Sequence, residues 1–214
     1  MTEIICLANS DKYGGRCIAG ISVQTGQWIR PVTNLADGRL PTNLTNIDNE
    51  PIKTLDKVNI PLSQKQGNGH EAENRLILAG SWTRNGRAEP SDLLSFTDTN
   101  LLHFHNKDWL NAIPFDYLES LPRHERRTLQ IIHTNYFGCF ISHGKWRGYI
   151  LGKNSGLMLD CSITAPEIRK RLDNGENIPA NCLVILSLSQ PWSPKDSIGK
   201  KMCHRLIVGI IELK

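Results

Sequence analysis

Short apolar runs of strand length recur along the first third of the chain. Residues 4–7 and 17–23 form two such runs, and a Gly-containing turn at 24–27 leads into a third at 28–32. Between 55 and 62, apolar and polar positions alternate, which is typical of a strand with one buried face. A further run at 75–82 precedes a turn at 84–87. The pattern predicts a β unit over residues 1–88.

The period of two is lost between residues 89 and 134. Prolines and helix-capping residues recur at intervals, including Pro90, Asp98 and Pro114, and the apolar positions around Trp109 and Leu118 do not alternate. Such spacing favours several short helices. We interpret this segment as a helical connector between two β units.

Strand patterns return in residues 135–214, at 139–142, 148–152, 157–161, 182–188 and 203–213. Between them, Thr164, Pro166 and Glu167 open a segment that carries helix-start signals, and Asn174 with Gly175 ends it. Two groups of short strands with an α-helical bridge predict a mostly β chain of the α+β type. The strands form either two small β-barrels or one composite sheet.

Composition is that of an ordinary globular protein. The chain has 214 residues, of which 39% are hydrophobic and 21% charged, and its net charge is +4. Its longest apolar stretches are strand-sized, and the first residues form a strand pattern without a basic leader, so we expect a cytoplasmic protein with no membrane segment. The six cysteines include no CxxC pair and are expected to be reduced core thiols.

Two stretches near the ends of the chain resemble a known family. Residues 6–20 (CLANSDKYGGRCIAG) are followed by WIRPV at 28–32, and the end combines a strand at 183–188, Gln190-Pro191-Trp192 and HRLIVGII at 204–211. This combination is similar to the bacterial family of dual OB-containing domains. The resemblance implies two small OB-like β-barrels, over 1–88 and 135–214, joined by a short-helical connector at 89–134. OB barrels commonly bind oligonucleotides across a sheet face and adjoining loops.

The first candidate binding segment is the loop at 10–16. Gly14 and Gly15 allow positive φ, Lys12 and Arg16 can neutralise phosphate, and Tyr13 can stack on a base. The loop lacks the ending of a phosphate-binding P-loop. A charged turn between two strands explains the same residues. Arg30 either extends this surface or pairs with a carboxylate.

The second candidate lies between residues 121 and 159, where cations far outnumber acids and aromatic residues are interleaved. Single-strand binding needs this mixture, because cations hold the backbone and flat rings accept unstacked bases. Residues 143–148 are predicted to form a turn that carries Lys145, Trp146 and Arg147. Phe137 and Phe140 are expected in the core. The alternative is that Trp146 caps the barrel and the charges are solvated.

A third basic segment spans 194–205 and includes Lys200 and Lys201. In an OB barrel a loop at this place can close over the ligand. An ordinary exposed loop has the same composition, so both interpretations stay open.

Metal and catalytic signals are weak by comparison. His103, His105, His133, Cys139 and His143 fit no standard ligand spacing, so we predict neither a metal nor a cofactor. No nucleophile elbow and no Cys–His arrangement is recognisable. We therefore expect binding rather than catalysis and assign no catalytic residue.

The leading hypothesis is a non-enzymatic module that binds single-stranded or structured nucleic acid, with DNA and RNA both open. A first alternative is a protein-interaction subunit of a bacterial multiprotein assembly, for example in defence. The apolar residues Trp109, Ile113, Phe115, Tyr117 and Leu118 favour it. A second alternative is recognition of a nucleotide or modified base. Phosphate binding weakens steeply as salt rises, whereas an apolar interface does not.

Overall fold

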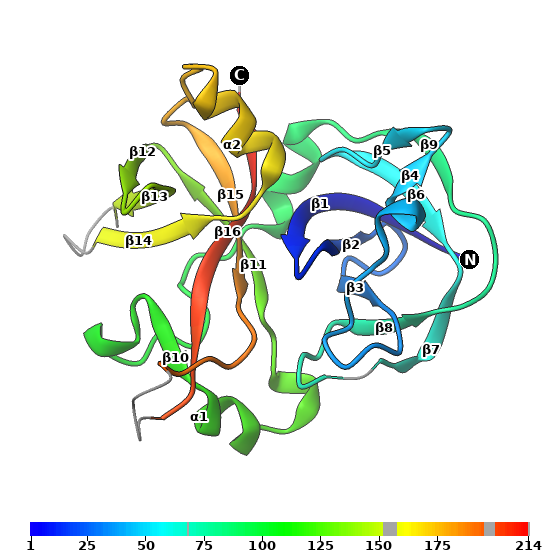
Figure 1. Ribbon diagram of the computed structural model, residues 1–214, viewed down its shortest axis with the longest axis horizontal. Coiled ribbons are helices and arrows are strands. Elements are labelled where there is room, and N and C mark those ends of the chain that lie inside the picture. The colour runs from blue at the N-terminus through cyan, green and yellow to red at the C-terminus, as the bar shows by residue number, and fades with distance from the viewer. Residues whose placement is uncertain (68, 152–157, 195–199, 214) are drawn as a thin grey trace. The chain divides into compact units, whose positions relative to one another are not determined.

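The computed structural model describes residues 1–67, 69–151, 158–194 and 200–213. The chain divides into two compact units, which we call unit 1 (Met1–Phe96) and unit 2 (Thr97–Lys214). Strands dominate both units (Figure 1). The predicted fold class, a mostly β chain with two OB-like barrels, is confirmed by the sheet topology of each unit.

Unit 1 contains a sheet with the strand order β7-β8-β3-β2-β1-β6-β9. The short strands β4 and β5 form a separate ribbon, and two 3₁₀ helices complete the unit. The elements are β1 (Thr2–Lys12), β2 (Gly15–Ser22), β3 (Trp28–Val32), η1 (Thr42–Thr45), β4 (Asn46–Ile47), β5 (Glu50–Pro51), β6 (Asp56–Ile60), β7 (Leu62–Gln66), β8 (Asn74–Ile77), β9 (Thr83–Arg87) and η2 (Pro90–Phe96).

The sheet of unit 1 closes on itself because β6 and β7 act as one bent strand. Pro61 separates them and has no N–H to donate to a ladder. Before the bend β6 pairs with β1, and after it β7 pairs with β8. β8 in turn runs parallel to β3. The closed order β1-β2-β3-β8-β7/β6 is a five-stranded barrel of the OB type.

The interior of this barrel is filled from alternate strand positions. Its buried core includes Ile4, Cys6, Ile18, Ile29, Val58 and Ile60. On β6 the buried and half-buried positions alternate, as the sequence pattern predicted. Gly20 allows β1 and β2 to approach, because a Cβ at this position would overlap the carbonyl oxygen of Ile5.

Unit 2 contains a sheet with the strand order β11-β15-β16-β14-β13-β12, and β10 pairs with β16 beside this path. The elements are η3 (Lys107–Trp109), β10 (Ala112–Pro114), α1 (Phe115–Ser120), η4 (Arg123–Glu125), β11 (Leu129–Thr134), β12 (Phe137–Ser142), β13 (Lys145–Leu151), β14 (Met158–Ile163), α2 (Pro166–Asp173), β15 (Cys182–Leu188) and β16 (Met202–Glu212).

Unit 2 closes in the same way, with its first strand bent instead of its fourth. The consecutive strands β11 and β12 pair with β15 and β13 respectively. β14 runs parallel to β16, as β3 does to β8 in unit 1. Helix α2 connects the third and fourth strands of the barrel (Figure 1), and it begins at Pro166 as predicted and buries Ile168 and Leu172.

The segment from 89 to 134, expected to be a helical connector, is divided between the units. η2 belongs to unit 1, whereas residues from Thr97 onward belong to unit 2 and supply β10 and β11. β11 pairs with β15, which lies about fifty residues away in the sequence. Local pattern cannot reveal so distant a partner, which explains why the sequence did not predict this strand.

None of the helices in the described part of the chain has the length and apolar content that a membrane crossing requires.

Candidate nucleic-acid interface

Three neighbouring strands of unit 2, β12, β13 and β14, present two chemically different faces. The inner face contributes Phe137, Ile150 and Cys161 to the barrel core. The register places Phe140 opposite Arg147, Arg147 opposite Ser162, and Tyr149 opposite Asp160. Because paired residues point to the same side of a sheet, these side chains share the outer face. We call this surface the outer face of β12–β14.

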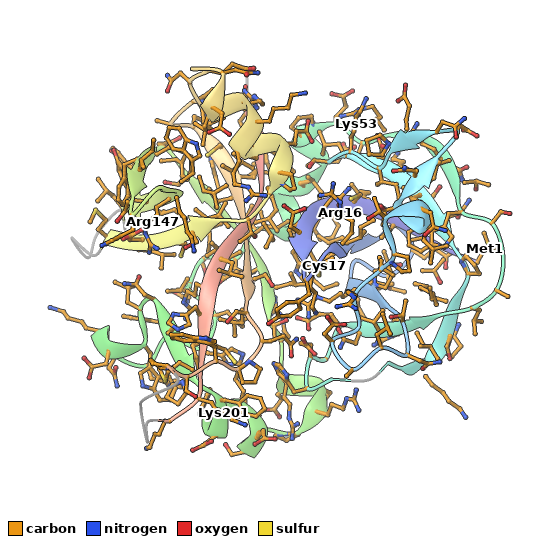
Figure 2. All side chains as sticks on the ribbon, viewed as in Figure 1. Met1, Arg16, Cys17, Lys53, Arg147 and Lys201 are labelled. Atoms are coloured by element: carbon orange, nitrogen blue, oxygen red, sulfur yellow. The ribbon has the colours of Figure 1, made fainter. Side chains whose placement is uncertain are left out.

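Arg147, labelled in Figure 2, is held on this face by three hydrogen bonds. Its Nε donates to Oδ1 of Asp160 at 2.6 Å, Nη1 donates to Oγ of Ser162 at 3.1 Å, and Nη2 donates to the Asp160 carbonyl oxygen at 3.1 Å. A guanidinium has five N–H donors in a rigid fork. Two of the five therefore stay unengaged by the described residues and are available to a ligand.

Two aromatic rings lie beside this arginine. The ring centroids of Phe140 and Tyr149 are 6.3 Å apart, and both side chains are half-buried. The Tyr149 ring covers Gly138, where a Cβ would overlap it. Lys145, at the start of β13, is exposed. The outer face thus combines flat rings with cations, the two components that unpaired nucleic acid requires.

The strand alternation corrects two sequence predictions. Trp146 faces away from Lys145 and Arg147, packs against the barrel core and donates its indole N–H to Oδ1 of Asp173 at 2.6 Å. The turn consists only of His143 and Gly144, with φ of 49° and 69°, and position 145 already begins β13. The three residues therefore do not form one patch, because neighbours along a strand point to opposite sides.

Phe140 was expected in the core and lies on the outer face instead. Phe137, for which the same expectation was made, is 5% exposed and belongs to the core. The two residues are three positions apart, so a strand places them on opposite sides. Tyr149 stands out in the sequence only as one of several aromatics, and a period of two counted from Arg147 would have singled it out.

The outer face continues onto β16 through His204 and Trp192. The indole of Trp192 lies 5.8 Å from the imidazole of His204 between ring centroids, and Trp192 is 56% exposed. Burial lowers the pKa of His204, and the charge of Arg147 lowers it further. Arg147 and His204 therefore share one electrostatic environment. Sequence reasoning assigned no binding role to Trp192, which has no aromatic or basic neighbour in the chain.

In unit 1 the β1–β2 hairpin brings three predicted residues to its tip. Lys12 pairs with Gly15 across a two-residue turn of Tyr13 and Gly14, whose φ values are 47° and 79°. Such a turn favours residues that tolerate positive φ. Tyr13 is 71% exposed, and Arg16 donates to Oδ1 of Asp11 at 2.8 Å. The tip offers an exposed ring and Lys12, while Arg16 is neutralised by its neighbour.

Arg30, predicted either to extend this surface or to pair with a carboxylate, does the latter. Its side chain is 3% exposed, and its Nη1 lies 3.4 Å from Oε1 of Glu71 and 3.4 Å from Oδ1 of Asn74. Burial by itself would lower the pKa of Arg30, but negative charge on Cys17, Glu71 and Glu73 raises it above its usual value. A buried, ion-paired guanidinium is not part of a phosphate-binding surface, so the surface role is withdrawn.

The third basic segment is described only in part. Lys200 and Lys201 are exposed just before β16, and the carbonyl oxygen of Lys201 accepts a hydrogen bond from the Phe115 N–H at 2.9 Å. Residues 195–199 of this loop lie outside the described residues, as does Lys153 of the second basic segment.

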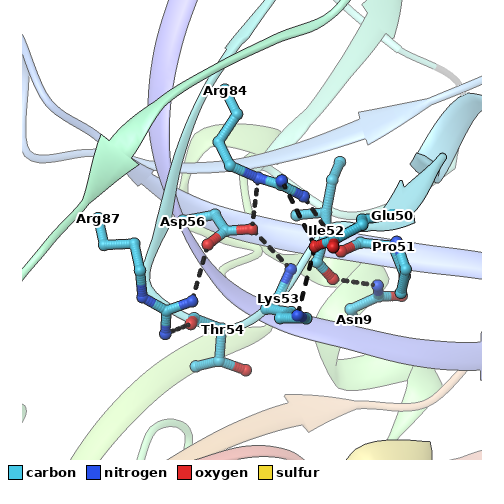
Figure 3. A network of polar contacts seen from close by, with 9 residues as sticks. All are labelled: Asn9, Glu50, Pro51, Ile52, Lys53, Thr54, Asp56, Arg84 and Arg87. Atoms are coloured by element: carbon cyan, nitrogen blue, oxygen red, sulfur yellow. Dashed lines mark hydrogen bonds and ion pairs between the residues drawn. The ribbon is translucent and has the colours of Figure 1, made fainter. Parts of the chain in front are cut away.

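Two further arginines of unit 1 are held by a buried carboxylate (Figure 3). Asp56 accepts from Nη1 of Arg87 at 3.0 Å and from the Lys53 N–H at 2.9 Å, and it lies 3.0 Å from Nε of Arg84. Asp56 itself is 1% exposed. This network fastens the edge strand β9 to β6, so we assign it a structural role.

Metal and thiol chemistry find no support in the described residues. No group of three or more His, Cys, Asp or Glu side chains is placed there to hold a metal ion. Burial raises the pKa of Cys139 to about 11 and those of Cys161 and Cys182 to about 12. These thiols are therefore protonated at neutral pH and behave as core residues.

The two closed barrels, each with a parallel pair of third and fifth strands, define a protein built from two OB folds. A family model described as the dual OB-containing domain matches residues 2–210, and the chain belongs to this family. No curated protein and no solved structure matches the chain.

Proposed function

We propose that this protein binds unpaired nucleic acid on the outer face of β12–β14, without a catalytic step. The observation that carries the proposal is the arrangement of Phe140 and Tyr149 beside Lys145 and Arg147 on these strands. β13 and β14 are the second and third strands of the unit 2 barrel. This is the face on which OB folds bind oligonucleotides.

Each side chain has a separate task in this proposal. Lys145 and the two available N–H groups of Arg147 contact phosphates, and the rings of Phe140 and Tyr149 stack on bases. Asp160 and Ser162 hold the guanidinium of Arg147 in place before the ligand binds. Binding therefore does not carry the entropic cost of ordering this side chain. The half-buried Lys12 and the exposed Tyr13 at the hairpin tip of unit 1 are proposed as additional contacts of that unit, and Lys200 and Lys201 as additional contacts of unit 2.

The test is a fluorescence anisotropy titration with labelled single-stranded DNA, single-stranded RNA and duplex, between about 50 and about 200 mM salt, the range over which phosphate contacts weaken strongly. We expect the unpaired strands to bind more tightly than the duplex, with an affinity that falls steeply as salt rises.

Two variants locate the binding on the outer face of β12–β14. Lys145→Glu is expected to weaken binding and to reduce the salt dependence, since it removes a phosphate contact. Tyr149→Ala is expected to cost about 1–3 kcal/mol of binding free energy through lost stacking. Lys170→Glu, at an exposed position of α2, is the matched control and should leave affinity unchanged. Wild-type affinity in both outer-face variants would refute this location.

A second candidate function, docking of a protein subunit, has one favourable observation. Leu151 and Met158 pair across β13 and β14, and they are 41% and 51% exposed. Exposed apolar side chains on a strand pair suit a protein partner, such as another component of a bacterial defence assembly. The apolar segment 109–118, which was expected to dock such a partner, packs inside unit 2 instead. Ile113 and Leu118 are fully buried there, and Trp109, Phe115 and Tyr117 pack against them. Insensitivity of partner capture to salt would favour this candidate.

A further inference from the structure

We propose that Trp192 is a second base-stacking platform, so that the ligand is a single strand several nucleotides long rather than a mononucleotide or a duplex. This inference rests on the proposed function and concerns the part of the site beyond β14. It adds a residue from the connection between β15 and β16, together with His204, to the outer face of β12–β14.

The backbone fixes the side to which Trp192 points. Trp192 and Met202 exchange two backbone hydrogen bonds of 3.0 and 2.9 Å as an antiparallel bridge. Bridge partners point to the same side of a sheet. On β16, Met202 and His204 are half-buried and alternate with the buried Cys203 and Arg205. Trp192 therefore lies on the outer side of β16, where more than half of its side chain is exposed.

Polar groups connect the two aromatic platforms. The Asp160 N–H donates to Oδ1 of Asn111 at 3.3 Å, and the next residue, Ala112, pairs with His204. Ser162 on β14 pairs with Leu206 on β16, two positions after His204. Arg147 thus lies between the Phe140–Tyr149 rings and the Trp192–His204 rings. A phosphate bound to Arg147 would belong to a nucleic-acid strand. Its bases would stack on the Phe140–Tyr149 rings on one side of Arg147 and on the Trp192–His204 rings on the other.

The spacing of strands sets the length of the ligand. Neighbouring strands are about 4.8 Å apart, so the three to four steps from β12 to Trp192 span roughly 14–19 Å. Stacked nucleotides are about 3.4 Å apart along one strand. The platforms are therefore separated by roughly four to six nucleotides, within the site size of a single OB fold. A duplex keeps its bases stacked and paired, so it cannot place them on two separate platforms.

The experiment is an anisotropy length series with labelled oligothymidylates of about two, four, six and eight nucleotides, a range that brackets the expected site. For the wild type, affinity should rise between the shortest and the longer oligonucleotides. Trp192→Ala should lower affinity for the longer ones by about 5- to 150-fold, the range expected for one lost stacking contact, and leave the shortest unchanged. Trp192→Tyr should restore most of the loss.

The controls separate this inference from the proposed function. Trp192→Ala keeps the backbone bridge to Met202, and Phe104→Ala removes another exposed aromatic outside these strands. Wild-type length dependence in Trp192→Ala, or an equal loss at every length, would overturn the second platform while binding itself persists. If the wild-type protein binds none of the oligonucleotides at low salt, the proposed function fails, and this inference with it.

Discussion

At the scale of single residues, the outer face of unit 2 and a buried ion pair of unit 1 show how the same residue type takes opposite roles. Arg147 is held by Asp160, but part of its guanidinium lies at the surface, because 28% of the side chain is exposed. Arg30 is 3% exposed and fully committed to the interior with Glu71. Only the first can meet a ligand, whereas the second contributes to stability.

The Arg30–Glu71 pair predicts an acid-sensitive stability. Burial by itself would raise the pKa of Glu71, but Arg30 and then His70 lower it from 4.5 to about 2. A carboxyl whose pKa is depressed on folding stabilises the protein above its unfolded pKa. This contribution, on the order of 3 kcal/mol, is lost as pH falls from about 4.5 to about 2. Glu71→Gln should lower stability at pH 7 by a similar amount and flatten this part of the curve.

Urea denaturation followed by circular dichroism at several pH values measures both effects. Glu50→Gln is a suitable control, since Glu50 is largely exposed and pairs only at the surface. A Glu71→Gln variant that keeps the full acid sensitivity of the wild type between pH 4.5 and pH 2 would contradict the assignment.

His204 predicts that nucleic-acid binding strengthens in mild acid. Its pKa is lowered first by burial and then by Arg147, so it is neutral at pH 7. Within the described residues, the charge of Arg147 acts on this imidazole, and the ring of Trp192 lies beside it. A phosphate nearby would favour the protonated imidazole, so affinity should rise as the pH falls from neutral into the acid range in which this imidazole takes up a proton.

Anisotropy titrations at constant ionic strength, from about pH 7.5 to about pH 5.5, span the titration range of histidine and test this dependence. His204→Gln should bind with an affinity that is nearly constant over the range. An equally steep pH dependence in the variant would show that another group is responsible. Circular dichroism at each pH shows whether the protein is folded, so a loss of binding through unfolding is recognised.

At the scale of elements, alternation along a strand decides which residues belong to the site. On β13, Trp146 is directed to the core and Tyr149 to the outer face. The sequence predicted that positions 145–147 lie together in a turn. β13 already begins at Lys145, so Trp146 points to the opposite side of the sheet from Lys145 and Arg147. The proposed binding residues of β13 are therefore every second residue, Lys145, Arg147 and Tyr149.

This alternation predicts that two aromatic substitutions on one strand have opposite consequences. Trp146→Phe removes the indole hydrogen bond to Asp173 and part of the core packing, so stability should fall by about 1–2 kcal/mol with affinity unchanged. Tyr149→Phe keeps the ring and should preserve affinity, in contrast to Tyr149→Ala. Thermal unfolding and anisotropy on the same samples separate the effect on stability from the effect on affinity. Reduced affinity in a folded Trp146→Phe variant would contradict the direction of Trp146 toward the core.

The close approach of β1 and β2 gives an element-scale test of the unit 1 barrel. Gly20→Ala places a Cβ against the Ile5 carbonyl oxygen, and because this atom is backbone, the strands must shift. We expect a loss of about 1–3 kcal/mol in the free energy of unfolding. Gly86→Asn is a comparison for backbone strain alone, since a Cβ at position 86 would meet no heavy atom within 4 Å although φ there is +89°. A Gly20→Ala variant that is as stable as the wild type would contradict the barrel packing.

At the scale of the whole molecule, local patterns predicted more of the fold than of the site. The period of two at 55–62 and the helix signals at Pro166 identified β6 and α2 because both depend on near neighbours in sequence. The bends that close each barrel, at Pro61 and between β11 and β12, depend on pairing with distant strands. The proposed binding face depends on cross-strand register, so Trp192, His204 and Tyr149 could not be selected from composition.

The central claim is the location of nucleic-acid binding, and amide chemical-shift mapping of the labelled protein tests it most directly. A single-stranded oligonucleotide of about eight nucleotides, enough to fill one OB site, is added in steps. We predict that the largest shifts fall on Lys145, Arg147 and Tyr149 of β13, on Asp160 and Ser162 of β14, and on the Trp192 indole. Shifts confined to the edge strand β9 and the arginines of the Asp56 network, or no shifts at low salt, would contradict the account.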